Sequence, residues 1–77
     1  MKIILGERLK ELRKEKGLTQ KEIAKELHIH SVTYLHYEKS EREPPLVLLA
    51  EMANFFEVSV DYLLGLTERE DPYPEKE

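Results

Sequence analysis

Hydrophobic residues recur at helical spacing along most of the chain, and no segment alternates between apolar and polar residues as a half-buried strand does. Leu5, Leu9 and Leu12 occupy positions i, i+4 and i+7, which form one face of a helix. Gly17 follows the last charged turn, where glycine commonly ends a helix. The pattern predicts a first helix over about residues 4–16.

The clearest helix start in the sequence lies at Thr19, which can act as an N-cap. Glu22, three residues later, can complete a capping box, and Leu18 can pack against Ile23 across the first turn. We expect this second helix to end near Leu27, because the same spacing of cap and apolar residues begins again shortly afterwards.

A third helix is predicted over about residues 31–39, where Ile29 and Tyr34 flank His30 at that spacing. Two short helices separated by three or four residues have the geometry of a helix-turn-helix. Short helices with tight turns also occur in many other all-α domains, so the spacing alone does not establish this motif.

Two further helices are expected after Pro44-Pro45, a pair that interrupts helical structure. Pro45 suits the first turn of a fourth helix. The apolar positions of that helix repeat at helical spacing: Leu46, Leu49, Ala50, Ala53 and Phe56. Ser59 is a typical N-cap and Gly65 a typical stop for a fifth helix of one or two turns.

These elements describe one small all-α domain over residues 1–66, followed at 67–77 by an acidic tail that we expect to be mobile. The chain has 77 residues, of which 40 % are hydrophobic, and such a short chain has room for one modest core. Dimerisation is therefore a possible source of stability. The absence of cysteine excludes disulfides and thiolate metal sites and is typical of an intracellular protein, so we expect a cytoplasmic location. The longest apolar run falls far short of the ~20 residues that span a bilayer.

Charge is distributed unevenly along the chain. Residues 2–21 hold seven basic and three acidic side chains, a net +4, whereas residues 22–77 hold five basic and thirteen acidic ones, a net −8. A polyanion would be attracted to the first segment despite the overall charge of −4. Alternating Lys and Glu on solvated helix faces would give the same composition, so charge alone does not decide the function.

Several strings in the sequence resemble the Cro/repressor-type (XRE) helix-turn-helix proteins of bacteria and their phages. The resemblance covers roughly residues 5–66 without an insertion and includes Arg8-Leu9-Lys10-Glu11-Leu12-Arg13, Gly17-Leu18-Thr19-Gln20-Lys21-Glu22-Ile23-Ala24, Tyr37-Glu38, Arg42-Glu43-Pro44 and Val58-Ser59-Val60-Asp61-Tyr62-Leu63-Leu64-Gly65. It implies a five-helix, lambda-repressor-like DNA-binding domain that acts as a dimer on inverted-repeat operators. We therefore expect a transcriptional regulator, and at the level of the family a repressor, whose partner is double-stranded DNA.

The resemblance also implies roles for individual residues. Gln20 is expected to donate to a DNA phosphate, although a plain surface role is the alternative. Arg13 is expected to pair with Glu38 and so tie the first helix to the third. The expected phosphate contacts are Gln20, Lys21, Lys39 and Arg42.

The matching positions for base contacts lie at the front and outer face of the third helix: His30, Ser31, Val32, Thr33, Leu35 and His36. These positions offer no Arg or Lys for guanine and no Asn or Gln for adenine. Readout would rely on the hydroxyl groups, a histidine and apolar contacts to thymine methyl groups, so we expect modest direct specificity supplemented by DNA shape.

The turn and the third helix depart from the family pattern. His28 stands where glycine is common, so a left-handed backbone there would be tolerated but not free of cost. His30 stands where Ser or Thr usually caps. We expect the third helix to be held more by Ile29, Tyr34 and Tyr37 than by its own start, and the two tyrosines should face inward and form a core with Ile23, Leu27 and Leu46.

Three histidines within nine positions, His28, His30 and His36, raise the alternative of a metal or pH-sensing site. We expect no metal, because cysteine is absent and the nearby carboxylates fall on other faces. A protonated His36 would strengthen DNA binding at low pH.

The sequence shows no phosphate loop, nucleophile motif or paired carboxylates, so we expect neither an enzyme nor a cofactor, and no small-molecule ligand is evident. A homodimer interface is expected near the fifth helix, at Val60, Leu63, Leu64 and Leu66. Such a dimer would hold two recognition helices roughly 34 Å apart across one turn of DNA. The alternative is a protein-interaction module that uses this surface and binds little DNA, and Phe55 and Leu63 could instead simply close the core.

Overall fold

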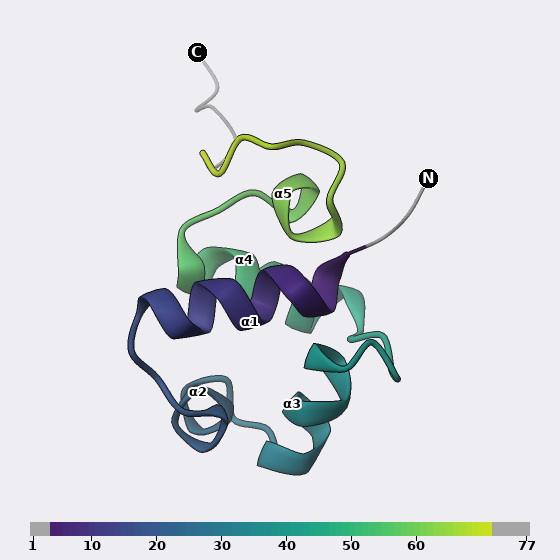
Figure 1. The fold of residues 1–77 in the computed structure, drawn as a ribbon. Coiled ribbons are helices and arrows are strands. Elements are labelled where there is room, and N and C mark those ends of the chain that lie inside the picture. The colour runs from purple at the N-terminus through teal and green to yellow at the C-terminus, as the bar shows by residue number, and fades with distance from the viewer. Residues whose placement is uncertain (1–3, 72–77) are drawn as a thin grey trace.

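Five helices joined by short turns make up residues 4–71, the part of the chain that the computed structural model describes (Figure 1). They are α1 (Leu5–Glu15), α2 (Gln20–Glu26), α3 (Ser31–Glu38), α4 (Leu46–Phe56) and α5 (Val60–Leu64), and this part of the chain contains no strand. α1 runs through the middle of the molecule, with α2 and α3 on one side of it and α5 on the other. The all-α prediction and its five elements are confirmed, with bounds that differ by a residue or two.

Two helix starts form as the sequence predicts. The N–H of Glu22 donates to Thr19 Oγ1 (3.1 Å) and the N–H of Thr19 donates to Glu22 Oε1 (2.8 Å), so the capping box at the start of α2 is complete. The N–H of Tyr62 donates to Ser59 Oγ (3.0 Å) at the start of α5. His30 forms no side-chain cap, as its chemistry suggested, and α3 begins without one.

All five helices end in the same way. Each is followed by a residue in the left-handed region, with φ between 57° and 85°. These residues are Gly17, His28, Ser40, Glu57 and Gly65. At every stop the N–H of this residue and the next N–H donate back to carbonyl groups of the last helical turn, the arrangement of a Schellman motif. The turn between α2 and α3 therefore has the left-handed His28 that the sequence predicted, with φ 61°.

The core lies where α1 meets the other helices. Its buried side chains are Leu5, Leu9, Leu12, Ile23, Ala24, Leu27, Tyr34, Tyr37, Leu49, Met52, Ala53, Phe56, Val58, Tyr62 and Leu63. Tyr34 and Tyr37 both face inward, as predicted, and the Tyr34 side chain is fully buried. α3 is thus held against the domain by its aromatic face.

The prediction for α4 is wrong at two positions. Leu46, expected to pack with the tyrosines, is 82 % exposed, and Ala50 also faces solvent. The helix buries Leu49, Met52, Ala53 and Phe56 instead. Because residues 46–50 are all apolar, the pattern could not tell which face the core covers, and Met52 takes the place assigned to Ala50.

The start of the predicted tail folds back onto the domain. Arg8 is only 6 % exposed, because its guanidinium lies over the ring of Tyr62 (3.9 Å to the centroid) and pairs with Glu68 Oε2 (3.0 Å). The carbonyl of Glu70 accepts from the N–H of Ser59 (3.2 Å), and its carboxylate accepts from the Tyr62 hydroxyl (3.3 Å). Residues 67–71 therefore contact α1 and α5, and the rest of the predicted tail lies outside the described residues.

Candidate nucleic-acid interface

One face of α3 points away from the core. Val32, His36 and Lys39 follow one another at i, i+4 and i+7 and form an outward stripe along the helix and its C-cap. Val32 is 62 % exposed, and His36 is partly exposed. The stripe gives α3 an uncovered outer surface directly opposite its buried tyrosines.

The other predicted base-contact residues lie around this stripe. His30 is exposed at the N-cap, and Ser31, Thr33 and Leu35 are half-buried. None of the six is fully buried, so the structure leaves each of them at least partly accessible at the same end of the molecule.

A cluster around Glu38 fixes α3 relative to α1 and α2. Arg13 Nε donates to Glu38 Oε2 (2.6 Å) and Arg13 Nη2 to Glu38 Oε1 (3.2 Å), so the expected ion pair is present and bidentate. Arg13 Nη1 also donates to the carbonyl of Leu18 (2.8 Å), before α2. Gln20 Nε2 donates to Glu38 Oε1 (3.0 Å). Three segments thus meet at one carboxylate.

Burial of Glu38 raises the pKa of its carboxyl group, but the hydrogen bonds from Arg13 and Gln20 outweigh this effect and leave the pKa below its ordinary value. The Tyr34 hydroxyl is buried beside this cluster and makes no hydrogen bond within the described residues. Its burial and the neighbouring carboxylate raise the pKa of the Tyr34 hydroxyl, which stays protonated. The cluster therefore carries a fixed negative charge at Glu38 balanced by Arg13.

Gln20 helps to hold α3 in place, a role that the sequence did not predict. Its side chain was expected to point to a phosphate, and the structure directs one of its N–H groups to Glu38. An amide nitrogen carries two donors, so a phosphate contact by the second stays a prediction. The other expected phosphate contacts, Lys21, Lys39 and Arg42, are all exposed.

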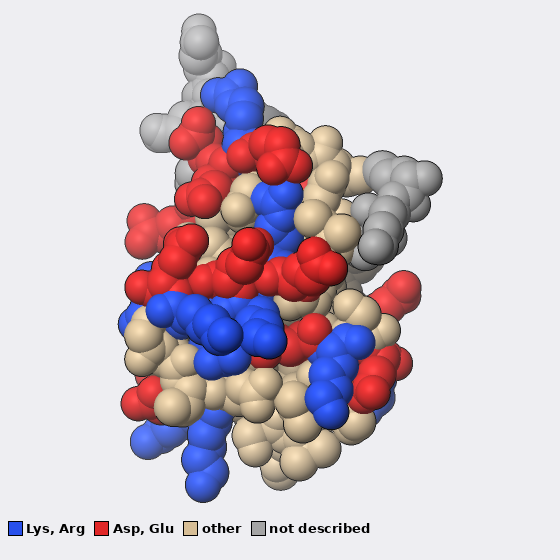
Figure 2. Space-filling model, in the orientation of Figure 1, with Lys and Arg blue, Asp and Glu red and all other residues tan. Residues whose placement is uncertain are grey.

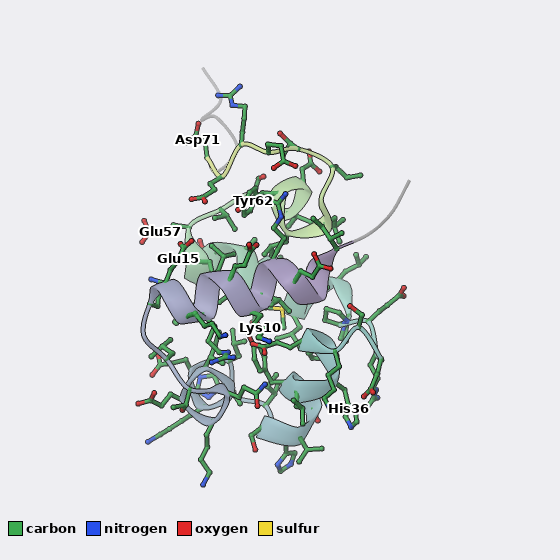
Figure 3. The ribbon with its side chains drawn as sticks, in the orientation of Figure 1. Lys10, Glu15, His36, Glu57, Tyr62 and Asp71 are labelled. Atoms are coloured by element: carbon green, nitrogen blue, oxygen red, sulfur yellow. The ribbon has the colours of Figure 1, made fainter. Side chains whose placement is uncertain are left out.

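Acidic and basic side chains form separate groups on the face of the molecule shown in Figure 2. Figure 2 shows a band of acidic side chains along α1 and a basic group directly below it. Lys10 lies on the side of α1 facing α3, whereas Glu15 lies on the opposite side (Figure 3). Lys10 and Lys14, one turn apart, are both exposed.

The basic segment is weaker as a polyanion-binding surface than its net charge of +4 suggested. Arg8 is buried against Tyr62 and paired with Glu68, and Arg13 is paired with Glu38, so neither charge is available to a polyanion. The attraction therefore falls to the exposed lysines of α1 together with Lys21, Lys39 and Arg42.

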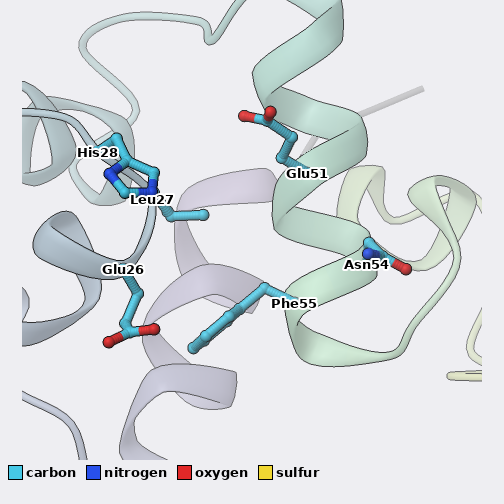
Figure 4. Close-up of a pocket in the computed structure, with 6 residues that line it drawn as sticks. All are labelled: Glu26, Leu27, His28, Glu51, Asn54 and Phe55. Carbon is cyan, nitrogen blue, oxygen red and sulfur yellow. The ribbon is translucent and has the colours of Figure 1, made fainter.

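A hollow between α2 and α4 lies apart from this surface (Figure 4). It measures about 260 Å³ and is lined by Glu26, Leu27, His28, Glu51, Asn54 and Phe55. Its two carboxylates would repel a phosphate, so we do not include it in the interface.

The histidines do not form a metal site in the described residues, which contain no group of three or more His, Cys, Asp or Glu side chains able to hold an ion. His36 pairs with Glu41 instead, with Nδ1 2.7 Å from Oε1. No helix in the described range is long and apolar enough to cross a membrane.

The family model for the helix-turn-helix matches residues 9–63, a range that runs from α1 to the penultimate residue of α5 and contains the whole candidate interface. The chain belongs to the Cro/repressor-type (XRE) helix-turn-helix family. α2 and α3 are the two helices of the motif, and α3 occupies the place of its recognition helix.

Relatives of this XRE domain are named as transcriptional regulators. The regulator ImmR of Bacillus subtilis is 45 % identical over 64 residues, which cover 83 % of this chain and 50 % of ImmR. The uncharacterized regulator YobD of the same organism is 41 % identical over 70 residues, which cover 91 % of this chain and 62 % of YobD. The chain thus spans between half and about three-fifths of these curated relatives.

A solved structure of an XRE-type repressor has the same fold. The P22 c2 repressor, crystallised in complex with a synthetic operator, superposes with a TM-score of 0.75 and 31 % identity. The match covers 79 % of this chain and 92 % of the repressor chain. The five-helix, lambda-repressor-like prediction is confirmed by this likeness.

The expected dimer residues of the XRE domain are less exposed than the sequence suggested. Leu63 is fully buried and belongs to the core, and Val60 and Leu64 are partly buried against it. Only Leu66, 46 % exposed, offers a large apolar surface. The most exposed apolar residues lie elsewhere: on the first turn of α4, Leu46 is 82 % exposed and Val47 is 73 % exposed.

The packing of α1 against the end of α3 requires glycine at position 6, which the sequence did not indicate. A Cβ atom at this position would collide with the carbonyl oxygen of Glu38 and with Ser40 Oγ. α1 therefore approaches the end of the recognition helix backbone to backbone, and only glycine allows this distance.

Proposed function

We propose that this chain is the DNA-binding part of a transcriptional repressor that inserts α3 into the major groove of operator DNA. The observation that carries the proposal is the uncovered stripe of Val32, His36 and Lys39 on a helix whose opposite face is fixed by buried tyrosines and by Glu38. An apolar residue 62 % exposed at the front of such a helix is costly in water, and contact with a thymine methyl group would remove that surface from water.

The base contacts would come from the stripe and its flanks. Val32, the Thr33 methyl group and Leu35 offer apolar contact, and the hydroxyl groups of Ser31 and Thr33 offer hydrogen bonds. His30 and His36 stand at the front and middle of the helix and supply ring nitrogens. Because no bidentate side chain is present, part of the specificity would come from DNA shape.

The phosphate contacts would surround α3. Lys21 at the start of α2, Lys39 at the end of α3 and Arg42 in the following loop are exposed cations, and Gln20 would use its second amide N–H. Three cations per chain predict that the logarithm of the binding constant falls with the logarithm of salt concentration with a slope of about −3 for one bound chain and of about −5 for a bound dimer.

The proposal is tested with a duplex library from which the chain selects its preferred sites, followed by fluorescence anisotropy on the selected duplex. Val32→Asp places a carboxylate on the groove-facing stripe, and we expect at least about a tenfold loss of affinity. Asn54→Asp adds the same charge on α4, outside the candidate interface, and should leave affinity within about twofold. Equal losses in both variants, or a wild-type chain that enriches no sequence, would contradict the proposal.

We also propose that the chain binds as a homodimer. The proposed interface lies around Leu46 and differs from the one near the fifth helix that the sequence suggested. Leu46 lies beside a hollow of about 190 Å³ lined by Leu5, Pro44, Leu49, Leu64, Glu43 and Leu46 itself. An exposed apolar side chain next to an apolar hollow suits a two-fold interface, because each copy can insert into the other. Leu64 is common to this surface and to the predicted one.

The alternative of a protein-interaction module built on α5 has less support. Leu63 is inaccessible, and Val60 and Leu64 are packed against the core, so the surface that this alternative needs is small.

A further inference from the structure

The recognition helix carries one side chain whose hydrogen-bonding role is determined by the protein. His36 lies on the outward stripe, with its side chain 38 % exposed, and its Nδ1 is 2.7 Å from Glu41 Oε1. Glu41 itself is 53 % exposed and lies just beyond the end of α3 (Figure 3 labels His36).

The backbone explains why these two residues meet. Ser40 adopts φ 60°, and the N–H of Glu41 donates to the carbonyl of His36 (2.9 Å), so the chain reverses direction immediately after α3. The same pair is thereby joined twice, once through the backbone and once through the side chains. Glu41 is held next to the histidine by the helix stop rather than by chance rotation of a long side chain.

The chemistry of the pair fixes the proton on one ring nitrogen. An ionised carboxylate only accepts hydrogen bonds, so Nδ1 must be the nitrogen that carries hydrogen. In a neutral imidazole the other nitrogen, Nε2, is then an acceptor. Within the described residues Nε2 has no protein partner.

The remaining base-facing groups do not have such a fixed role. The hydroxyl groups of Ser31 and Thr33 can donate or accept. His30 forms no hydrogen bond with a carboxylate in the described part of the chain, so neither of its nitrogens is assigned as acceptor. His36 is therefore the one predicted base-contact side chain that presents a single, defined hydrogen-bonding function.

We propose that Glu41 is a positioning residue for sequence readout: it holds His36 with Nε2 as an acceptor, so that His36 selects a base that presents an amino group in the major groove, adenine N6 or cytosine N4. Guanine and thymine present acceptors at the corresponding places and would be disfavoured. This inference rests on the proposed function, because it assumes that α3 enters the major groove.

The negative charge of Glu41 could affect DNA binding in two different ways. As a mere charge, Glu41 would oppose the neighbouring phosphate-contacting cations and weaken binding to every sequence alike. As a positioning residue, it shapes the preference at one base position. The two roles give different results when Glu41 is removed.

The state of the ring is tested first, in the free protein. Long-range ¹H–¹⁵N spectra of the labelled chain at pH 8, where an imidazole is normally neutral, report which nitrogen carries hydrogen. We expect His36 to be protonated at Nδ1 in the wild type and to become a mixture of both forms in Glu41→Ala. Glu26→Ala removes an exposed carboxylate of α2 that lies outside the candidate interface and should change nothing. Protonation of wild-type His36 at Nε2 would overturn the inference.

Sequence preference is tested next, by selection from a randomised duplex library at pH 8 with the wild type, Glu41→Ala, Glu26→Ala and His36→Ala. We expect Glu41→Ala and His36→Ala to lose about tenfold preference for adenine or cytosine at the same single position and to keep the preferences elsewhere. Glu26→Ala should keep the complete wild-type preference.

The possible failures are distinguishable. If the wild type enriches no sequence, the proposed function fails and the inference fails with it. If the wild type enriches a site and Glu41→Ala enriches the same site with the same preferences, the inference alone is overturned. Loss of preference at different positions in Glu41→Ala and His36→Ala would overturn it as well.

Discussion

Glu38 is the residue on which the position of α3 depends most directly. Its carboxylate accepts from Arg13 on α1 and Gln20 on α2, and its side chain is 4 % exposed. A buried charge is costly unless it is paired, and removing one partner leaves the other unpaired. The ion pair could be expected from the family resemblance, but the third member could not, because a glutamine at a helix start has many possible partners.

We expect Glu38→Gln to lower the free energy of unfolding at neutral pH by about 2 kcal/mol, since Arg13 loses a charged acceptor. The pKa of Glu38 is depressed in the folded state, so the stabilisation is complete above the unfolded value of about 4.3 and is lost as pH falls through the folded value. Urea titrations of wild type and variant should therefore converge between pH 7 and pH 3.

Glu26→Gln, which alters an exposed carboxylate on α2, is the control and should be close to the wild type at each pH. A difference between Glu38→Gln and the wild type that stays constant as pH falls would contradict the assignment of the shifted pKa to this residue.

Two residues with decisive structural roles gave no signal in the sequence. Gly6 is required by the carbonyl of Glu38, thirty-two positions later, and Arg8 is buried by Tyr62 of α5 and by Glu68, which follows that helix. Local patterns describe neighbours along the chain, whereas these roles arise only when distant segments meet.

At the scale of elements, the two hydroxyl-capped helix starts and the two glycine stops followed the sequence, whereas the left-handed stops at Ser40 and Glu57 were not predicted. Capping boxes and glycine stops act through hydrogen bonds within six residues, so their residues can be recognised without the fold. The exposed face of α4 could not be predicted in this way, because its first five residues are all apolar and the choice of face depends on what packs against them.

The helix stops lead to a prediction about backbone strain. Glu57 adopts φ 57° at the end of α4, a conformation that costs a side-chain-bearing residue about 1 kcal/mol relative to glycine. We expect Glu57→Gly to raise the free energy of unfolding by roughly this amount and the melting temperature by about 4–8 °C, as measured by thermal and urea unfolding.

Gly17→Ala is the matched reverse change, because a Cβ there meets nothing within 4 Å and only the positive φ of 71° is penalised. It should lower stability by a similar amount. If Glu57→Gly is neutral or destabilising while Gly17→Ala behaves as expected, Glu57 contributes an interaction beyond its backbone conformation.

At the scale of the whole molecule, the two sides of α1 carry opposite charge. The acidic band lies along α1, and Lys10 lies on the side of α1 that faces α3. The sequence showed that basic and acidic residues are separated along the chain. In the folded domain such groups are also separated in space, and this separation would orient the domain as it approaches a polyanion.

The proposed dimer gives the whole-molecule prediction. Leu46 and Val47 are a small apolar surface compared with the roughly 800 Å² per partner of a stable interface, so we expect weak association without DNA. Val47→Glu should abolish the association seen by sedimentation equilibrium at high micromolar concentration. Val32→Glu changes a similarly exposed valine on α3 and should associate like the wild type. Equal association of both variants and the wild type would rule out this surface.

The repeated helix stop has a practical consequence for reprogramming the domain. The left-handed residues His28 and Ser40 lie on either side of α3, and both stops form through backbone hydrogen bonds, so they do not require particular side chains at the outward positions of α3. Residues 31–38 can be replaced by other helical sequences, provided that these keep Tyr34, Tyr37 and Glu38, which hold α3 against the domain. Outward positions can then be diversified in a library without rebuilding the scaffold.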